Sequence, residues 1–173
     1  MLLRYKKLNK DATEPTCGHE GDAGLDLYSV EDYQINAGNT VMVHTGIAVE
    51  IPPGYFGAVY ARSGLATKQG LRPANCVGVI DSPYRGEIIV ALHNDSICTC
   101  RTVKKGDRIA QLIIQPYMSV ILQETDELSD TTRGSGGFGS TGVSSPNNTC
   151  FDYEQITLKE VVENKDYYLG GGT

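Results

Sequence analysis

The 173-residue chain lacks the features typical of membrane proteins, secreted proteins and nucleic-acid-binding proteins. It has no run of about 18 apolar residues, the length that a membrane-spanning helix needs. Its start, MLLRYKKLNKDATEP, lacks the apolar core of a secretory signal. Lys and Arg number 15 against 21 Asp and Glu, so the chain cannot easily form a broad basic surface. We expect a soluble intracellular protein, cytoplasmic or nuclear, that binds neither nucleic acid nor membrane.

Five cysteines and three histidines are present, and their spacing matches no common metal site. The five cysteines form no CxxC pair, and their odd number does not favour a disulfide framework. The three histidines lack the HExxH spacing of zinc proteases. We interpret the cysteines as reduced thiols that serve mainly in packing.

The apolar residues that are present recur with a period of two. In TVMVHTGIAVEI (residues 40–51) every second position from Val41 is apolar except Thr45, which is typical of one long half-buried strand. Similar short segments are separated by turns such as PPGY and KKGD, and only SGLATKQG looks helical before residue 150. The pattern predicts an all-β domain, a barrel or a jelly-roll-like double sheet.

The last thirty residues differ in character from the rest. Polar turn residues are followed by YEQITLKEVVENKDYYL, which could form a further helix of about four turns. Its apolar residues do not form a clean stripe. A packed appendage, a partner-binding segment and partial disorder all remain open for this extension.

Five segments contain residues that a plain β-barrel does not require: DAGLDLYS, ARSGLAT, NCVGVIDSPYRGE, GDRIAQLI and RGSGGFGSTG. Most have an ordinary structural interpretation when taken singly. An Asp beside a Gly is usually a turn, Ser63 could cap the helix that follows it, and DSPYRG looks like a hairpin loop. The last segment is less easily a linker, because it also contains Arg133 and Phe138.

Together and in this order, the five segments resemble the motifs of the homotrimeric all-β dUTPases, the deoxyuridine triphosphate nucleotidohydrolases. The likeness covers roughly residues 20–142. It implies a jelly-roll-like, distorted β-barrel subunit with one short helix, and active sites shared between the chains of a homotrimer. It also implies hydrolysis of dUTP to dUMP and pyrophosphate with Mg²⁺, which keeps uracil out of DNA and supplies dUMP for dTMP synthesis.

The resemblance assigns a role to each matching residue. Asp81 would be the general base that activates a water for attack on the α-phosphate, a task for which a carboxylate beside a bound water is suited. Asp26 would contact Mg²⁺ indirectly, through water. The residues implied for substrate binding are Arg62, Ser63, Gly64, Asn75, Gly78, Val79, Ile80, Tyr84, Ile89, Gln111, Arg133, Phe138, Gly139 and Ser140.

Within that set, the contacts differ by chemistry. The backbone of residues 75–80 would read the uracil edge, and Tyr84 would exclude a ribose 2′-hydroxyl by steric clash. Arg62 and its neighbours would bind the α- and β-phosphates, and Gln111 would contact the phosphate chain or its waters. In the last motif the glycines allow close backbone approach to an anion, Arg133 offers a positive fork for the γ-phosphate, and Phe138 a flat face for uracil.

We therefore expect a β-barrel domain over residues 1–130, a mobile glycine-rich arm over residues 131–142 and an extension of open role over residues 143–173. Two departures from the family stand out: Ala61 replaces a proline common before Arg-Ser-Gly, and the extension follows the arm. A protein partner bound through the extension is one of its open roles.

Two alternative functions compete with dUTP hydrolysis. The related dCTP deaminases carry a glutamate where this chain has Ala91, so the proton shuttle for deamination is missing. A catalytically silent regulatory trimer is the other alternative. Retention of Asp81, Arg62, Arg133 and Phe138 together weighs against it.

Overall fold

Short apolar segments between turns fold as eleven strands and one helix in the part of the chain that the computed structural model describes, residues 1–137. By contacts the chain divides into two units, Met1–Leu122 and Gln123–Thr173. The elements, all in the first unit, are β1 (Arg4–Lys7), β2 (Leu25–Tyr28), β3 (Tyr33–Ile35), β4 (Thr40–His44), β5 (Ile47–Glu50), β6 (Tyr55–Ala61), α1 (Ser63–Gln69), β7 (Leu71–Pro73), β8 (Gly78–Ile80), β9 (Ile89–Asn94), β10 (Arg101–Val103) and β11 (Arg108–Pro116).

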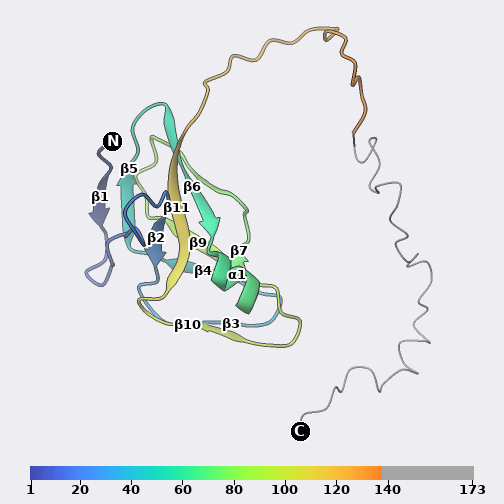
Figure 1. Ribbon diagram of the computed structural model, residues 1–173. Helices are drawn as coiled ribbons and strands as arrows, with labels where there is room; N and C mark the ends of the chain where they lie inside the picture. Colours follow the sequence, from blue (N-terminus) through green and yellow to red (C-terminus); the bar gives the residue numbers. More distant parts are fainter. Residues whose placement is uncertain (138–173) are drawn as a thin grey trace, which may run out of the picture. The chain divides into compact units, whose positions relative to one another are not determined.

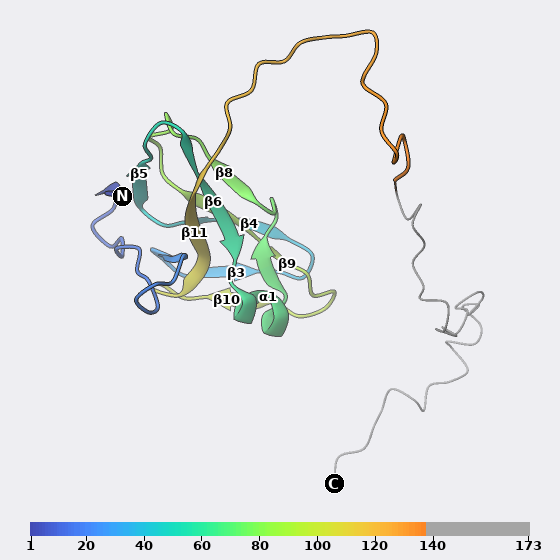
Figure 2. The same ribbon diagram turned by 45° about the horizontal axis from the view of Figure 1, so that its top comes forward.

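The strands form small antiparallel sheets with many crossovers. The largest has the order β2-β11-β6-β8, and a second has the order β4-β9-β7. Two further pairs are β1 with β5 and β10 with β3. Figures 1 and 2 show these strands wrapped around a common interior, with α1 following the end of β6. This non-sequential antiparallel order confirms the all-β, jelly-roll-like fold class.

The core lies between the sheets and is filled by aliphatic side chains. Leu27 of β2 and Leu112 of β11 are fully buried from one sheet, and Val43 of β4 and Leu92 of β9 from the other. All four belong to one continuous cluster. Because the strands alternate their side chains between faces, one face of each sheet supplies the core.

The single long strand expected over residues 40–51 is wrong. The chain breaks after His44 and restarts at Ile47, and the two halves pair in different sheets, β4 with β9 and β5 with β1. Gly46 adopts a positive φ of 66°, which side chains disfavour. A Cβ at this position would also lie within 3.0 Å of neighbouring side chains. Alternation of apolar residues continues across the break, so sequence period alone could not reveal it.

The short helix expected in SGLATKQG is confirmed as α1. Arg62 occupies its N-cap position with extended backbone, and Gly70 ends it in the left-handed conformation with φ 64°. With seven residues, α1 is the sole helix of the described region, and no helix there is long and apolar enough to span a membrane.

The second unit is described only as far as residue 137. Its described part contains turns and no regular element. Gly134 donates its N–H to the carbonyl of Thr131, and Gly136 donates to the carbonyl of Arg133. The helix expected near the carboxyl end lies outside the described residues, as does the extension over residues 143–173.

Candidate active site

One cluster of predicted site residues, those expected to contact the phosphates and Mg²⁺, surrounds Asp26. Its carboxylate is buried in the edge strand β2, with the residue only 3% exposed. Arg62 Nε donates to one carboxylate oxygen at 3.1 Å, and Arg108 Nη1 donates to the other at 3.2 Å. Arg62 Nη1 also donates to the carbonyl of Arg108 at 3.3 Å. The buried carboxylate therefore holds two positive side chains in a defined place, as an anion-binding site requires.

The residues around this cluster come from adjacent elements. Arg62 follows β6 directly and precedes α1, which begins with Ser63 and Gly64. Within the described residues no side chain caps this helix start, so the capping role considered for Ser63 is not seen. Gln111 lies on β11 opposite both Asp26 and Tyr60. The side-chain amide of Gln111 packs so close to Gly24 that a Cβ there would lie 3.2 Å from its nitrogen.

A hollow of about 410 Å³ opens beside the two arginines. Besides Arg62 and Arg108, its lining residues are Leu65, Gln69, Leu71, Thr102, Val103, Gly106, Asp107 and Ile109. Arg62 is about a quarter exposed and Arg108 about half exposed, so both guanidinium groups keep donors available to a ligand. This side of the unit is chemically suited to bind phosphate.

A second cluster contains the residues expected to contact uracil and the sugar, together with Asp81. It lies on the segment between β7 and β9. Its start is fastened to β9, because the N–H of Ala74 donates to the carbonyl of Ala91 at 2.7 Å. Asn75 packs on Gly78, where an added Cβ would lie 3.3 Å from the amide nitrogen. Residues 75–80 therefore form an exposed loop, residues 75–77, that leads into β8, where Gly78 is buried and Val79 exposed.

Arg72 of β7 connects the beginning of the loop at residues 74–77 to the residue after β9. Its guanidinium makes two hydrogen bonds to Asp95, of 2.8 and 2.9 Å, and a third to the carbonyl of Pro73 at 3.3 Å. The hydrogen bond to Asp95, followed by the contact with Cys76, raises the pKa of Arg72 above its ordinary value. Arg72 thus stays charged and keeps the loop attached to the barrel at every physiological pH.

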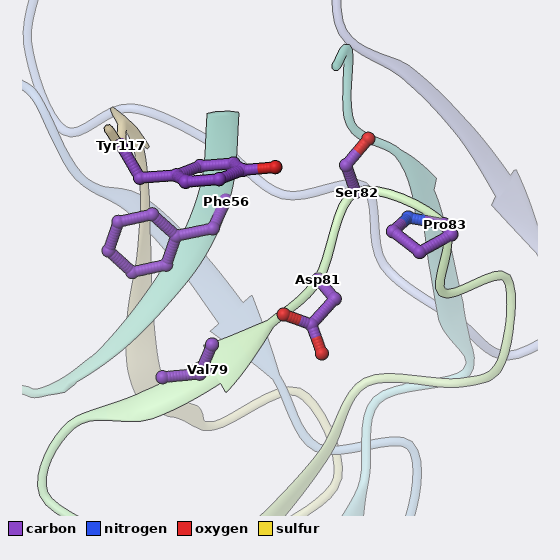
Figure 3. Close-up of a pocket in the computed structure, with 6 residues that line it drawn as sticks. All are labelled: Phe56, Val79, Asp81, Ser82, Pro83 and Tyr117. Carbon is purple, nitrogen blue, oxygen red and sulfur yellow. The ribbon is translucent and has the colours of Figure 1, made fainter. Parts of the chain in front are cut away.

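Asp81 follows β8 and lies exposed in the wall of a pocket of about 470 Å³. The other lining residues are Phe56, Val79, Ser82, Pro83 and Tyr117. In Figure 3 the rings of Phe56 and Tyr117 lie close together on one wall, and the Asp81 carboxylate stands apart from both rings. The pocket combines an accessible carboxylate with an apolar surface. Such a pocket is suited to a ligand that has an apolar part next to a polar group.

Tyr84 and Ile89, two further predicted site residues, are exposed outside this pocket. Tyr84 closes a turn by donating its N–H to the carbonyl of Asp81 at 3.0 Å, and its side chain leaves the residue 45% exposed. Ile89 begins β9 and is 37% exposed, and Val79 is 59% exposed. Such exposed apolar side chains are available to a ligand or a partner and do not belong to the core.

The two clusters lie far apart within one chain. Ile80 pairs with Gly57, so Asp81 lies level with Phe56 near the beginning of β6. Arg62 follows the other end of the same strand, six residues further on. At about 3.3 Å per residue this separates them by about 20 Å. The backbones at Asp81 and Arg62 therefore lie near opposite ends of β6.

A divalent metal can be tested against these side chains. Among residues 1–137, no group of three or more His, Cys, Asp or Glu side chains is placed to hold a metal ion. Each Asp26 oxygen accepts one arginine bond and keeps further capacity for water. The residues present therefore fit a metal held by the oxygens of a bound triphosphate, with protein contacts through water. The predicted indirect contact of Asp26 stays a prediction.

Of the four substrate-binding residues predicted in the arm, only Arg133 is described. Its Nε donates to the carbonyl of Gly136 at 2.9 Å within the second unit. Phe138, Gly139 and Ser140 lie outside the described residues.

Sequence reasoning missed several residues of both clusters. Arg108 stands within the quoted motif GDRIAQLI, and its charge beside a predicted phosphate contact was the available signal. Phe56 and Tyr117 line the Asp81 pocket, although they belong to no motif. They meet only because β6 pairs with β11 in register, Tyr55 opposite Pro116.

Comparisons with known proteins agree on one family. The family model of the dUTPases matches residues 10–142. The deoxyuridine 5′-triphosphate nucleotidohydrolase of Rhodococcus erythropolis is 45% identical over 142 residues, covering 82% of this chain and 87% of that protein.

Solved structures give the same result. A dUTPase variant of Staphylococcus bacteriophage 80alpha, solved with dUpNHpp, superposes with a TM-score of 0.77 at 31% identity, covering 82% of this chain and 99% of that chain. A dUTPase variant of phage phi11 of S. aureus, which shows the coordination of a structural Mg(II) ion, has a TM-score of 0.68 at 26% identity, covering 73% and 98%. The chain therefore belongs to the dUTPase family, the dUTP diphosphatases that hydrolyse dUTP.

Proposed function

We propose that this enzyme cleaves dUTP to dUMP and pyrophosphate in sites shared between the chains of a homotrimer, with Asp81 as general base. The observation that carries the shared site is the separation of about 20 Å between Arg62 and Asp81 along β6. A triphosphate is too short to bridge that gap while its innermost phosphate reacts. This separation supports a site in which the phosphate-binding and catalytic residues come from different subunits.

A second observation supports self-association. Four apolar residues after β11 are almost fully exposed in the single chain: Met118, Val120, Ile121 and Leu122, at 73–97%. Monomeric proteins rarely expose such a continuous apolar segment, because its burial between subunits is favourable. Residues 117–122 thus offer the contact surface that a trimer needs.

In the proposed reaction, Asp81 takes a proton from a bound water as its oxygen attacks the α-phosphorus. The bond between the α-phosphorus and the oxygen bridging to the β-phosphorus breaks, and pyrophosphate leaves with that electron pair. Arg62, with the backbone of Ser63 and Gly64 and the side chain of Gln111, holds the phosphate chain in line for displacement. Mg²⁺, when bound to the triphosphate, neutralises its oxygens and stabilises charge on the departing pyrophosphate.

Selectivity for deoxyuridine would come from the loop between β7 and β9. The backbone of Asn75 and residues 78–80 would read the edge of uracil, with Ile89 at the border of the pocket. Tyr84 would lie against the deoxyribose and leave no room for a 2′-hydroxyl. The arm, residues 131–142, would complete the site through Arg133 and Phe138 and exclude water, with Gly139 and Ser140 as further substrate-binding residues.

Mixed trimers test this proposal directly. Arg62→Ala and Asp81→Asn should each be nearly inactive as homotrimers, the latter by about 10²- to 10⁴-fold through loss of the base. Unfolding and refolding the two together should restore activity, because some sites then take Arg62 from one chain and Asp81 from another. Random assortment predicts recovery to about a quarter of the wild-type rate.

The control is the same treatment of each variant alone, which should restore nothing. If the mixture stays inactive although mixed trimers form, the shared site is wrong. Asp81→Asn should also bind a nonhydrolysable dUTP analogue with nearly wild-type affinity by calorimetry. Equal losses of binding and turnover would remove Asp81 from the role of base.

A further inference from the structure

A half-buried carboxylate just beyond the sugar-contacting turn lies outside the residues assigned above. Glu87 follows Gly86 in the motif SPYRGE, and its side chain is only 22% exposed. One carboxylate oxygen accepts the N–H of Gly46 at 2.6 Å, and the other lies 2.9 Å from His44 Nδ1. Glu87 therefore fastens its own segment to the tight turn between β4 and β5.

The backbone reinforces this attachment. Thr45 Oγ1 donates to the carbonyl of Ile88 at 2.6 Å, and the N–H of Ile88 donates to the carbonyl of Ile47 at 2.8 Å. Thr45 and Ile88 are both fully buried. The turn is itself fixed by its neighbours. The side chains of Asn9, Ala12 and Val30 pack closely on Gly46, and the carbonyl of Gly46 accepts the N–H of Leu8 at 2.8 Å. The segment at residues 87–88 is thus held against a rigid support.

Tyr84 takes its position from that segment. Its phenol donates a hydrogen bond to the backbone carbonyl of Glu87 at 3.0 Å. Its ring lies directly over Gly86, where an added Cβ would overlap the phenol oxygen and lie 2.5 Å from Cζ. The residue is 45% exposed, so a large part of it faces solvent and not the packed interior. The orientation of the ring therefore depends on where the Glu87 carbonyl is held.

We propose that Glu87 is a positioning residue for sugar discrimination, acting through Tyr84. This inference rests on the proposed role of Tyr84 against the deoxyribose. Steric exclusion of a 2′-hydroxyl works only if the excluding ring cannot move aside, because a shift of a few tenths of an ångström relieves the clash. The contacts of Glu87 with Gly46 and His44 supply the stiffness that the exposed ring lacks.

The test compares kcat/KM for dUTP and for UTP. Glu87→Ala should lower the ratio of the two values by about tenfold, the effect of losing one charged hydrogen bond. Glu87→Gln keeps an oxygen that can accept the Gly46 N–H, so it should recover most of the ratio. The matched control is Glu50→Gln, an exposed glutamate paired with Arg4 at 3.4 Å, which should leave the ratio unchanged.

Tyr84→Phe provides a variant that leaves Glu87 and its contacts unchanged. It removes only the hydrogen bond to the Glu87 carbonyl and should also lower the ratio several-fold. In a Tyr84→Ala background, adding Glu87→Ala should cause no further loss, because both act through the same ring. A wild-type ratio in Tyr84→Phe overturns the proposal, even if Glu87→Ala does not fold. So does an additive loss in the double variant.

The same measurements separate this inference from the proposed function. If the wild-type enzyme does not prefer dUTP to UTP, or Tyr84→Ala keeps the preference, the sugar-contacting role of Tyr84 is wrong. If Tyr84→Ala abolishes the preference while Glu87→Ala and Tyr84→Phe keep it, only the role of Glu87 fails.

Discussion

Replacing Asp26 with asparagine tests the arginine cluster most directly. The change preserves the shape of the side chain but removes its charge and one of its two acceptor oxygens. Arg62 Nε is 3.1 Å from the carboxylate, and Arg62 is largely buried. Arg108 is 3.2 Å away, but about half exposed. Both guanidinium groups would then lack a full charge partner.

The expected loss of stability follows from these exposures. A charge-assisted hydrogen bond in a largely buried pair contributes about 1.5–3 kcal/mol. The half-exposed pair with Arg108 contributes about 0.2–1 kcal/mol because solvent screens it. Since asparagine retains one acceptor, we expect Asp26→Asn to lower the free energy of unfolding by about 2 kcal/mol.

A functional effect should accompany the loss of stability. Arg62 would no longer be held at the proposed phosphate site, so KM for dUTP should rise by about tenfold. Kinetics with dUTP would measure this change. Urea unfolding at one fixed protein concentration would measure stability, because the stability of an oligomer depends on protomer concentration. Glu50→Gln serves as the exposed control, with an expected change below about 0.5 kcal/mol.

A double-mutant cycle gives the decisive result. Asp26→Asn and Arg62→Gln should be coupled by at least about 1 kcal/mol, because each removes the same contact. Additivity of the two changes within about 0.3 kcal/mol would refute the reasoning. An unchanged KM in Asp26→Asn would show that Arg62 needs no support from this carboxylate.

Two further predictions concern polar groups elsewhere in the barrel. Asn94 is fully buried, and its amide donates to the carbonyls of Ile35 and Thr99, at 2.9 and 2.8 Å. Asn94→Leu should therefore lower the free energy of unfolding in urea by about 3 kcal/mol, because both carbonyls lose their partner. A loss below about 0.5 kcal/mol contradicts this prediction. The hydrogen bond from Lys104 lowers the pKa of Asp32. Its stabilisation is complete above the unfolded pKa and disappears as pH falls through the lowered folded pKa, so the urea midpoint gap between wild type and Asp32→Asn should close in acid and not at neutral pH.

Much of the fold class and of the site composition could be predicted from local patterns. Period-two apolar residues between turns predicted an all-β unit, and SGLATKQG predicted α1, because both patterns depend on neighbours along the chain. The motifs predicted the family, which the comparisons confirm. The break at Thr45 and Gly46 escaped the prediction because alternation is the same whether a strand continues or passes to another sheet.

Sequence by itself determined which chemical groups this enzyme carries and which family it belongs to, since the motifs are short stretches whose residues are read in order. Only the tertiary structure decided where those groups meet. The register of β6 with β8 places Asp81 beside the beginning of β6, whereas Arg62 follows the end of the same strand. Asp26 contacts two arginines that lie 36 and 82 residues away along the chain. The physical reason is that such contacts depend on how distant strands pair and pack, which no local period records.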